Sequence, residues 1–249
     1  HTCVILDNGL VSCWGNGGTG QLGNAGNYNS NTPIFTSSLG TGRTAVALSS
    51  GESHNCVILD NGAVSCWGPG ASGQLGNGGT STEYTPTLTS SLGINRTAVA
   101  ISSGQGGEHT CAILDNGAVS CWGYGANGQL GNEGTSDKTT PTLTSSLGIN
   151  RTAVAISLGG SHTCAILDNG AVSCWGNGGS GRLGNGGTTS FSVPPTRYDD
   201  TTVFGQSTAT AVEGQPMNYS LRGSVFDNIN YSQVNFLVQT PPGVVFNVG

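Results

Sequence analysis

Eight cysteines and four histidines are the residues of this 249-residue chain whose types and spacing most directly suggest chemistry. The cysteines form four pairs, and a histidine lies two residues before the first cysteine of each pair. Two kinds of chemistry fit this pattern: a disulfide within each pair, or a metal site with two sulfur ligands and one nitrogen ligand. The pairs are Cys3 with Cys13, Cys56 with Cys66, Cys111 with Cys121 and Cys164 with Cys174, preceded by His1, His54, His109 and His162.

The turn between the paired cysteines favours the disulfide. In the first copy this turn is Asp7-Asn8-Gly9, and if these three residues form the loop, with Gly9 in the left-handed position after a type I turn, Cys3 faces Cys13. A two-residue Asn-Gly loop would instead place Cys3 opposite Trp14. The spacing therefore predicts a cross-strand disulfide, which contributes roughly 3 kcal/mol in the chain-entropy model. An even count in regular pairs also predicts an oxidising compartment, outside the cell or at its surface.

A metal site with a Cys2His ligand set is the alternative in every copy. Structural zinc sites more often use two cysteines separated by two residues, so we expect no metal and no cofactor. Each histidine is then expected to lie at the edge of its sheet and to hydrogen-bond a loop.

Three further patterns resemble active-site or ligand-binding motifs. Gly-x-Gly-x-x-Gly occurs once per copy, as in Gly15 to Gly20, but Gln-Leu-Gly-Asn follows it in place of a helix, which indicates a structural turn. One aspartate per copy lies in the hairpin turn, and one tryptophan ends the hairpin, so we expect turn formers and packing residues in place of a glycosidase or sugar site. We predict no catalytic residue. The four turn aspartates and the four hairpin tryptophans are Asp7, Asp60, Asp115, Asp168, Trp14, Trp67, Trp122 and Trp175.

Four Asn-x-Ser/Thr sequons are candidate glycosylation sites. Two of them occupy equivalent positions of the repeat, so they are also explained as by-products of repetition. The four asparagines are Asn95, Asn150, Asn218 and Asn230.

The elements that position these residues recur along the chain. The segment from His1 to Gly15 returns three times, with leading cysteines 53, 55 and 53 residues apart, and a Gly-Gln-Leu-Gly-Asn block or its Gly-Arg-Leu-Gly-Asn variant follows each copy. Each unit has about four short apolar segments, of the kinds Pro-x-Leu-Thr, Thr-Ala-Val-Ala-Ile, Cys-x-Ile-Leu and Ala-Val-Ser-Cys-Trp. This period and strand number are typical of propeller blades, so we predict an all-β chain of four-stranded antiparallel sheets.

Composition agrees with many tight turns. Glycine contributes 43 of 249 residues, about 17% against a usual share of about 7%. Collagen is excluded because the glycines are not at every third position. A net charge of −6, with 7 Lys and Arg in total, argues against binding to nucleic acid. No apolar run is long enough to cross a bilayer.

The pattern Gly-x-x-His-x-x-x-Leu-x-x-x-Gly-x-Val-x-x-Trp-Gly, followed by Gly-Gln-Leu-Gly, resembles the regulator of chromosome condensation repeat over residues 1 to about 195. The resemblance implies a β-propeller. Because the best-known members have seven blades, four copies imply a fragment, an open arc, a small ring or blades shared between protomers. The acidic charge departs from the nuclear members, and the cysteines make bacterial secreted members the more similar group.

We expect three regions. Residues 1–190 hold the four repeats, at about 1–53, 54–108, 109–161 and 162–190, and residues 191–207 form a linker. Residues 208–249 resemble the opening strands of a bacterial immunoglobulin-like or cadherin-like module, about 40 residues against about 100 for a complete sandwich.

Both ends of the chain read as incomplete β units. This predicts a non-enzymatic extracellular structural protein of a surface, adhesion or fibre assembly, whose copies associate by strand addition. The alternative is a secreted binding module, an inhibitor or lectin-like propeller, whose partners would be surface proteins or glycans.

Overall fold

The computed structural model describes residues 1–195, and fourteen strands and one 3-10 turn lie in this part of the chain. The strands are β1 (Thr2–Ile5), β2 (Val11–Gly15), β3 (Ser30–Phe35), β4 (Ala45–Ser50), β5 (Asn55–Leu59), β6 (Val64–Gly68), β7 (Glu83–Leu88), β8 (Ala98–Ser103), β9 (His109–Leu114), β10 (Val119–Gly123), β11 (Lys138–Leu143), β12 (Ala153–Leu158), β13 (His162–Leu167) and β14 (Val172–Gly176). The 3-10 turn is η1 (Gly179–Gly181). None of the described elements is a helix long and apolar enough to cross a membrane.

The strands form four antiparallel sheets of neighbouring strands, which confirms the predicted all-β blades. The second sheet has the order β4-β5-β6-β7 and the third is β8 to β11, while the first sheet (β1 to β3) and the fourth (β12 to β14) have three strands each within residues 1–195. A single antiparallel β-bridge between Gly176 and Phe191 extends the fourth sheet beyond β14. The sheets are offset from the sequence repeats, because the Ala45–Ser50 strand pairs with the hairpin that follows it.

The Cys hairpins have the predicted three-residue loop. Gly9 has φ 76°, the Leu6 amide donates to the Leu10 carbonyl at 2.8 Å, and Cys3 pairs with Cys13 in the register. The Asn8 side chain also accepts the Leu10 amide at 3.1 Å, which stabilises the turn locally. The same register recurs in the other three hairpins, where Cys66 lies opposite Cys56, Cys121 opposite Cys111 and Cys174 opposite Cys164.

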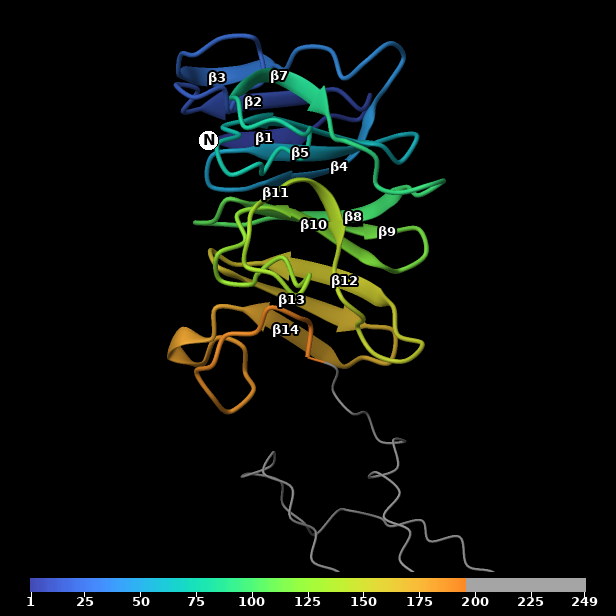
Figure 1. Ribbon diagram of the computed structural model, residues 1–249. Helices are drawn as coiled ribbons and strands as arrows, with labels where there is room; N and C mark the ends of the chain where they lie inside the picture. Colours follow the sequence, from blue (N-terminus) through green and yellow to red (C-terminus); the bar gives the residue numbers. More distant parts are fainter. Residues whose placement is uncertain (196–249) are drawn as a thin grey trace, which may run out of the picture. The chain divides into compact units, whose positions relative to one another are not determined.

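The four sheets follow one another in chain order, with the first and fourth at opposite ends of the stack (Figure 1). Each hydrophobic core lies between two neighbouring sheets and is formed by apolar side chains of both. Between the first and second sheets, for example, Val11 and Leu22 pack with Val57 and Trp67. A middle sheet is therefore apolar on both faces.

One compact unit covers His1–Thr201, so the described repeats belong to it. The predicted linker (191–207) lies mostly, and the predicted immunoglobulin-like segment (208–249) wholly, outside the described residues.

Candidate functional site

The eight cysteines form four disulfides, one across each hairpin, with 4.1 Å between the paired Cα atoms. The cysteines of the two middle hairpins are fully buried. These are the pairs that the turn spacing predicted: Cys3 with Cys13, Cys56 with Cys66, Cys111 with Cys121, and Cys164 with Cys174.

The disulfides also decide between the two kinds of chemistry that the cysteines could do. Because each sulfur is bonded to its partner, it is not available as a thiolate ligand. Residues 1–195 contain no group of three side chains placed to hold a metal ion. The cysteines therefore stabilise the hairpins and leave the histidines to another role.

The histidines join neighbouring sheets. His54 on the second sheet is buried, and its Nε2 lies 2.8 Å from the Thr110 hydroxyl on β9 of the third sheet. His109 makes the equivalent contact with Thr163 at 3.0 Å. We call the interface between two neighbouring sheets a seam. The expectation that each histidine hydrogen-bonds a loop was wrong, because the rings of His1, His54 and His109 reach across a seam to a strand residue of the next sheet.

One backbone carbonyl per seam accepts two further hydrogen bonds from the next sheet. The Gln74 carbonyl accepts from the Trp122 indole at 2.9 Å and from the Thr110 hydroxyl at 3.0 Å. We call this set of His, Thr, Trp and Gln carbonyl the seam network. It recurs at the other two seams, with Asn55 in place of Thr at the first; its remaining members are His1, Gln21, Asn55, Trp67, His109, Gln129, Thr163 and Trp175.

Three of the four tryptophans therefore pack between sheets, as predicted, whereas Trp14 is only half-buried within residues 1–195. Trp67, Trp122 and Trp175 are fully buried. A Cβ placed on Gly76, which follows Gln74 and Leu75, would lie 2.7 Å from the Trp122 indole nitrogen, so only glycine lets the ring approach this closely. Gly76 ends the Gly-Gln-Leu-Gly block, which therefore makes room for the next tryptophan. The glycine-rich motif before it forms a turn, in which the Gly73 amide donates to the Gly70 carbonyl at 2.8 Å, and this confirms the sequence interpretation.

Burial lowers the pKa of the seam histidines. The pKa of His54 falls to about 4 through desolvation. Desolvation lowers the pKa of His109 to about 3, with smaller contributions from the charges of His54 and His162. Both rings are therefore neutral near pH 7, and the chemistry of the seam is hydrogen bonding between neutral groups.

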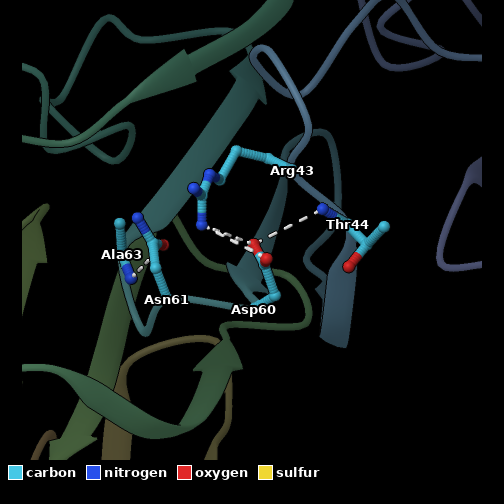
Figure 2. Close-up of polar contacts among 5 residues, drawn as sticks. All are labelled: Arg43, Thr44, Asp60, Asn61 and Ala63. Carbon is cyan, nitrogen blue, oxygen red and sulfur yellow. Dashed lines mark hydrogen bonds and ion pairs between the residues drawn. The ribbon is translucent and has the colours of Figure 1, made fainter.

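Three ion pairs connect the hairpin turns to the loops that precede the strands β4, β8 and β12. Figure 2 shows the first, in which the Asp60 carboxylate accepts from the Arg43 guanidinium at 3.2 Å and from the Thr44 amide at 3.5 Å. The turn role of these aspartates is confirmed, but sequence reasoning missed the arginines, although an Arg-Thr-Ala-Val-Ala segment recurs three times and indicates them. The other pairs are Arg96–Asp115 and Arg151–Asp168.

Two of the four sequons lie within the described residues. Asn95 and Asn150 are exposed in turns, with φ of 54° and 55°. The threonine of the first sequon packs on a hairpin glycine, since a Cβ on Gly62 would lie 2.4 Å from the Thr97 Cβ. Glycosylation stays a prediction, and Asn218 and Asn230 lie outside the described residues.

Family models described as the regulator of chromosome condensation (RCC1) repeat match this chain. One matches residues 8–58, 61–113 and 116–166, and a second matches 45–74, 98–129 and 153–182.

Individual proteins show the same similarity. The ultraviolet-B receptor UVR8 of Arabidopsis thaliana is 34% identical over 197 residues, covering 78% of this chain and 43% of the receptor. The human WBSCR16 structure has a TM-score of 0.67 at 21% identity over 77% of this chain and 49% of that chain. Yeast RCC1 (Prp20), in a structure with Kap60 bound, has a TM-score of 0.66 at 20% identity over 80% of this chain and 46% of that chain. This chain thus spans less than half of each of these proteins.

Proposed function

This chain belongs to the regulator of chromosome condensation repeat family, and from that premise we propose that it is a non-catalytic, extracellular module that binds another protein. The observation that carries the proposal is that the side chains of the repeated polar residues are bonded to other parts of the fold. Histidine, threonine, tryptophan and glutamine join the sheets, cysteines staple the hairpins, and aspartates hold the turns. What is left for recognition is the exposed loops on a rigid frame.

The loops beside the hairpin turns are the proposed binding edge. Ile94 and Ile149 occupy equivalent positions there and are 90% and 79% exposed. The ion pairs Arg96–Asp115 and Arg151–Asp168 lie beside them. Exposed large apolar side chains rimmed by charged groups are typical of protein-binding surfaces. The yeast relative is described with another protein bound, which supports protein binding as a use of this fold.

An extracellular location is supported by the disulfides. Four regular disulfides and no free cysteine among the residues of the repeat region are typical of secreted and surface proteins. Mass spectrometry of native material under non-reducing conditions tests this point. Four intact disulfides are expected, and eight free thiols would contradict the location.

The binding proposal is tested with a double variant, Ile94→Asn with Ile149→Asn. The purified, oxidised chain is used to capture surface and secreted proteins of the source organism. We expect the variant to retain at least about tenfold less of a captured partner, because the apolar anchors are lost.

The matched control changes Leu88 and Leu143 to asparagine. Both leucines are 56% exposed and end the strands β7 and β11 that lead into these loops, so the control asks whether capture depends on the two isoleucines or on any exposed apolar side chain near them. The control should capture as much as the unchanged chain. Equal capture by the two double variants would contradict the proposed edge, and no selective partner for the unchanged chain would contradict the binding function.

A structural, self-associating subunit stays a prediction from the sequence. Strand addition by another copy would protect the Thr2–Ile5 amides from hydrogen exchange in filaments seen by electron microscopy. Filaments in which these amides exchange as fast as in monomers would contradict strand addition.

A further inference from the structure

The turns that precede β4, β8 and β12 share one backbone conformation. In the turn before β8, the Arg96 amide donates to the Gly93 carbonyl at 3.3 Å, and Asn95 between them has φ 54°. The equivalent residue is Asn150 in the turn before β12, with φ 55°, and Gly42 in the turn before β4, with φ 67°. This left-handed position therefore accepts glycine or asparagine, two residue types that adopt it readily.

The asparagines complete a sequon that the turn before β4 lacks. Asn-Arg-Thr begins at Asn95 and at Asn150, whereas the turn before β4 reads Gly42-Arg43-Thr44. The fold explains the arginine and the threonine in all three turns, because the arginine pairs with a hairpin aspartate and the threonine lies against a hairpin glycine. The asparagine is thus the one residue of the sequon that the turn does not require.

Both asparagine side chains are accessible for modification. Asn95 and Asn150 are exposed, and neither side-chain amide has a hydrogen bond to any residue within 1–195. By contrast, the Asn61 side chain in a hairpin turn accepts the Ala63 amide at 3.1 Å. A glycan on either sequon asparagine would therefore break no contact of the fold.

The same two turns carry the apolar side chains of the proposed binding edge. Ile94 and Ile149 directly precede the two asparagines and are 90% and 79% exposed. The turn before β4, which has no sequon, has Thr41 at this position. A group attached to either asparagine therefore lies beside an exposed isoleucine.

We propose that Asn95 and Asn150 carry N-linked glycans, and that these glycans partly cover the binding edge and so regulate access to it. The inference rests on the proposed function, both for the role of the edge and for the extracellular location. Because an N-linked glycan is bulky and hydrophilic, it lowers the affinity of the edge for an apolar partner surface.

The modification is a group transfer to the side-chain nitrogen. Nδ2 of the asparagine attacks the anomeric carbon of a sugar that a transferase presents as a lipid-linked diphosphate. The bond between that carbon and the diphosphate oxygen breaks, the lipid diphosphate leaves, and one amide proton passes to a base of the transferase.

Asn95→Gly with Asn150→Gly is the variant that tests the modification. Glycine removes the attachment atom and keeps the left-handed turn, as Gly42 does before β4. Peptide mapping by mass spectrometry of the full chain, secreted by its source organism, should show a glycan on both asparagines of the unchanged protein and none at these positions of the variant. An unmodified asparagine at either position would overturn the proposal.

Gly42→Asn is the matched variant that adds a site. It completes an Asn-Arg-Thr sequon in the turn before β4, with the arginine and threonine already in place. We expect this turn to be glycosylated as well, because the three turns share their backbone conformation. An unmodified turn before β4 would contradict the argument from turn geometry.

Coverage of the edge is measured without any partner. Hydroxyl-radical footprinting of the folded, oxidised chain reports the accessibility of the Ile94 and Ile149 side chains. Oxidation of both should rise at least about twofold in the double glycine variant, because a bulky group beside each of them is removed. Val46, which is 62% exposed on β4 and follows the turn without a sequon, is the internal control and should not change. Equal oxidation of the isoleucines in the two proteins would overturn the coverage.

The capture assay separates this inference from the proposed function. The double glycine variant should retain at least about tenfold more of a captured partner than the glycosylated chain, because its apolar anchors are uncovered. Equal capture would overturn the regulatory role of the glycans. A double glycine variant that captures no selective partner would instead contradict the proposed function, and peptide mapping and footprinting would still decide whether glycans cover the edge.

Discussion

The seam histidines illustrate how one buried side chain carries the chemistry of the repeat. His54 bonds its neighbour through Nε2, and its ring is excluded from water. Protonation would place a charge in that apolar seam next to a hydroxyl that already donates to the Gln74 carbonyl. A charge without a countercharge is costly in this environment, so the ring stays neutral.

This buried neutral state predicts that acid weakens the fold. The pKa of His54 is about 4 in the folded chain, against an ordinary value of 6.5, so the unfolded chain binds more protons between these values. Stability contributed by His54 is fully present above pH 6.5 and is lost as the pH falls towards 4, by about 3 kcal/mol in total. Urea unfolding from pH 7 to pH 4 measures it. A His54→Gln variant should show a flatter dependence, and an equally steep one would contradict this assignment.

The tryptophan indole is the second residue whose role can be isolated. Trp122→Phe keeps most of the ring but removes the donor to the Gln74 carbonyl, which still accepts from Thr110. We expect a loss of about 1–2 kcal/mol in the free energy of unfolding. Trp14→Phe is the control and should cost much less, since within residues 1–195 its indole has no hydrogen-bond partner. Equal losses would contradict the hydrogen-bond argument.

At the scale of the element, the hairpin turn depends on glycine for two separable reasons. Gly117 has φ 76°, and a Cβ there would lie 2.4 Å from the Thr152 Cβ. Gly170 has φ 83° but no described neighbour within 4 Å. The first position therefore combines backbone strain with a close contact, and the second has backbone strain only.

Alanine at the two positions should separate these effects. Gly170→Ala should cost about 1–2 kcal/mol from the left-handed conformation alone, and Gly117→Ala should cost clearly more, since Thr152 must move. Thermal or urea unfolding of both variants gives the comparison. A Gly117→Ala variant that is as stable as Gly170→Ala would show that the contact relaxes freely.

At the scale of the whole repeat region, each sheet within residues 1–195 packs against its chain neighbours, so stability is expected to be a sum of sheets and seams. The seam between the second and third sheets joins two halves of the stack (Figure 1). Weakening that seam should therefore uncouple the halves.

Trp122→Ala is the change that tests this coupling, because the ring is fully buried at that seam. We expect unfolding to change from one transition to two, with amides of the first two sheets and the last two sheets exchanging separately. Hydrogen exchange followed by mass spectrometry resolves the sheets. Tyr124→Ala, at a side chain that is 36% exposed in the loop after β10, should leave one transition. A single transition for Trp122→Ala would contradict the linear model.

The hairpin register and the fold class of this protein follow from local residue spacing that can be recognised in the sequence. The spacing around Asp7-Asn8-Gly9 determines the hairpin register, because only a three-residue loop brings Cys3 opposite Cys13. The recurrence of that hairpin determines the all-β blades, because each copy leaves apolar side chains on both faces that only neighbouring copies can cover.

The tertiary structure alone decided which residues meet across the seams. His54, Thr110 and the Gln74 carbonyl come from separate segments, and the acceptor is a backbone group that no side-chain motif marks. For the same reason the sequence suggested a loop partner for the histidine and missed Arg43 opposite Asp60. Local spacing specifies contacts within a hairpin, whereas contacts between sheets depend on how the sheets stack.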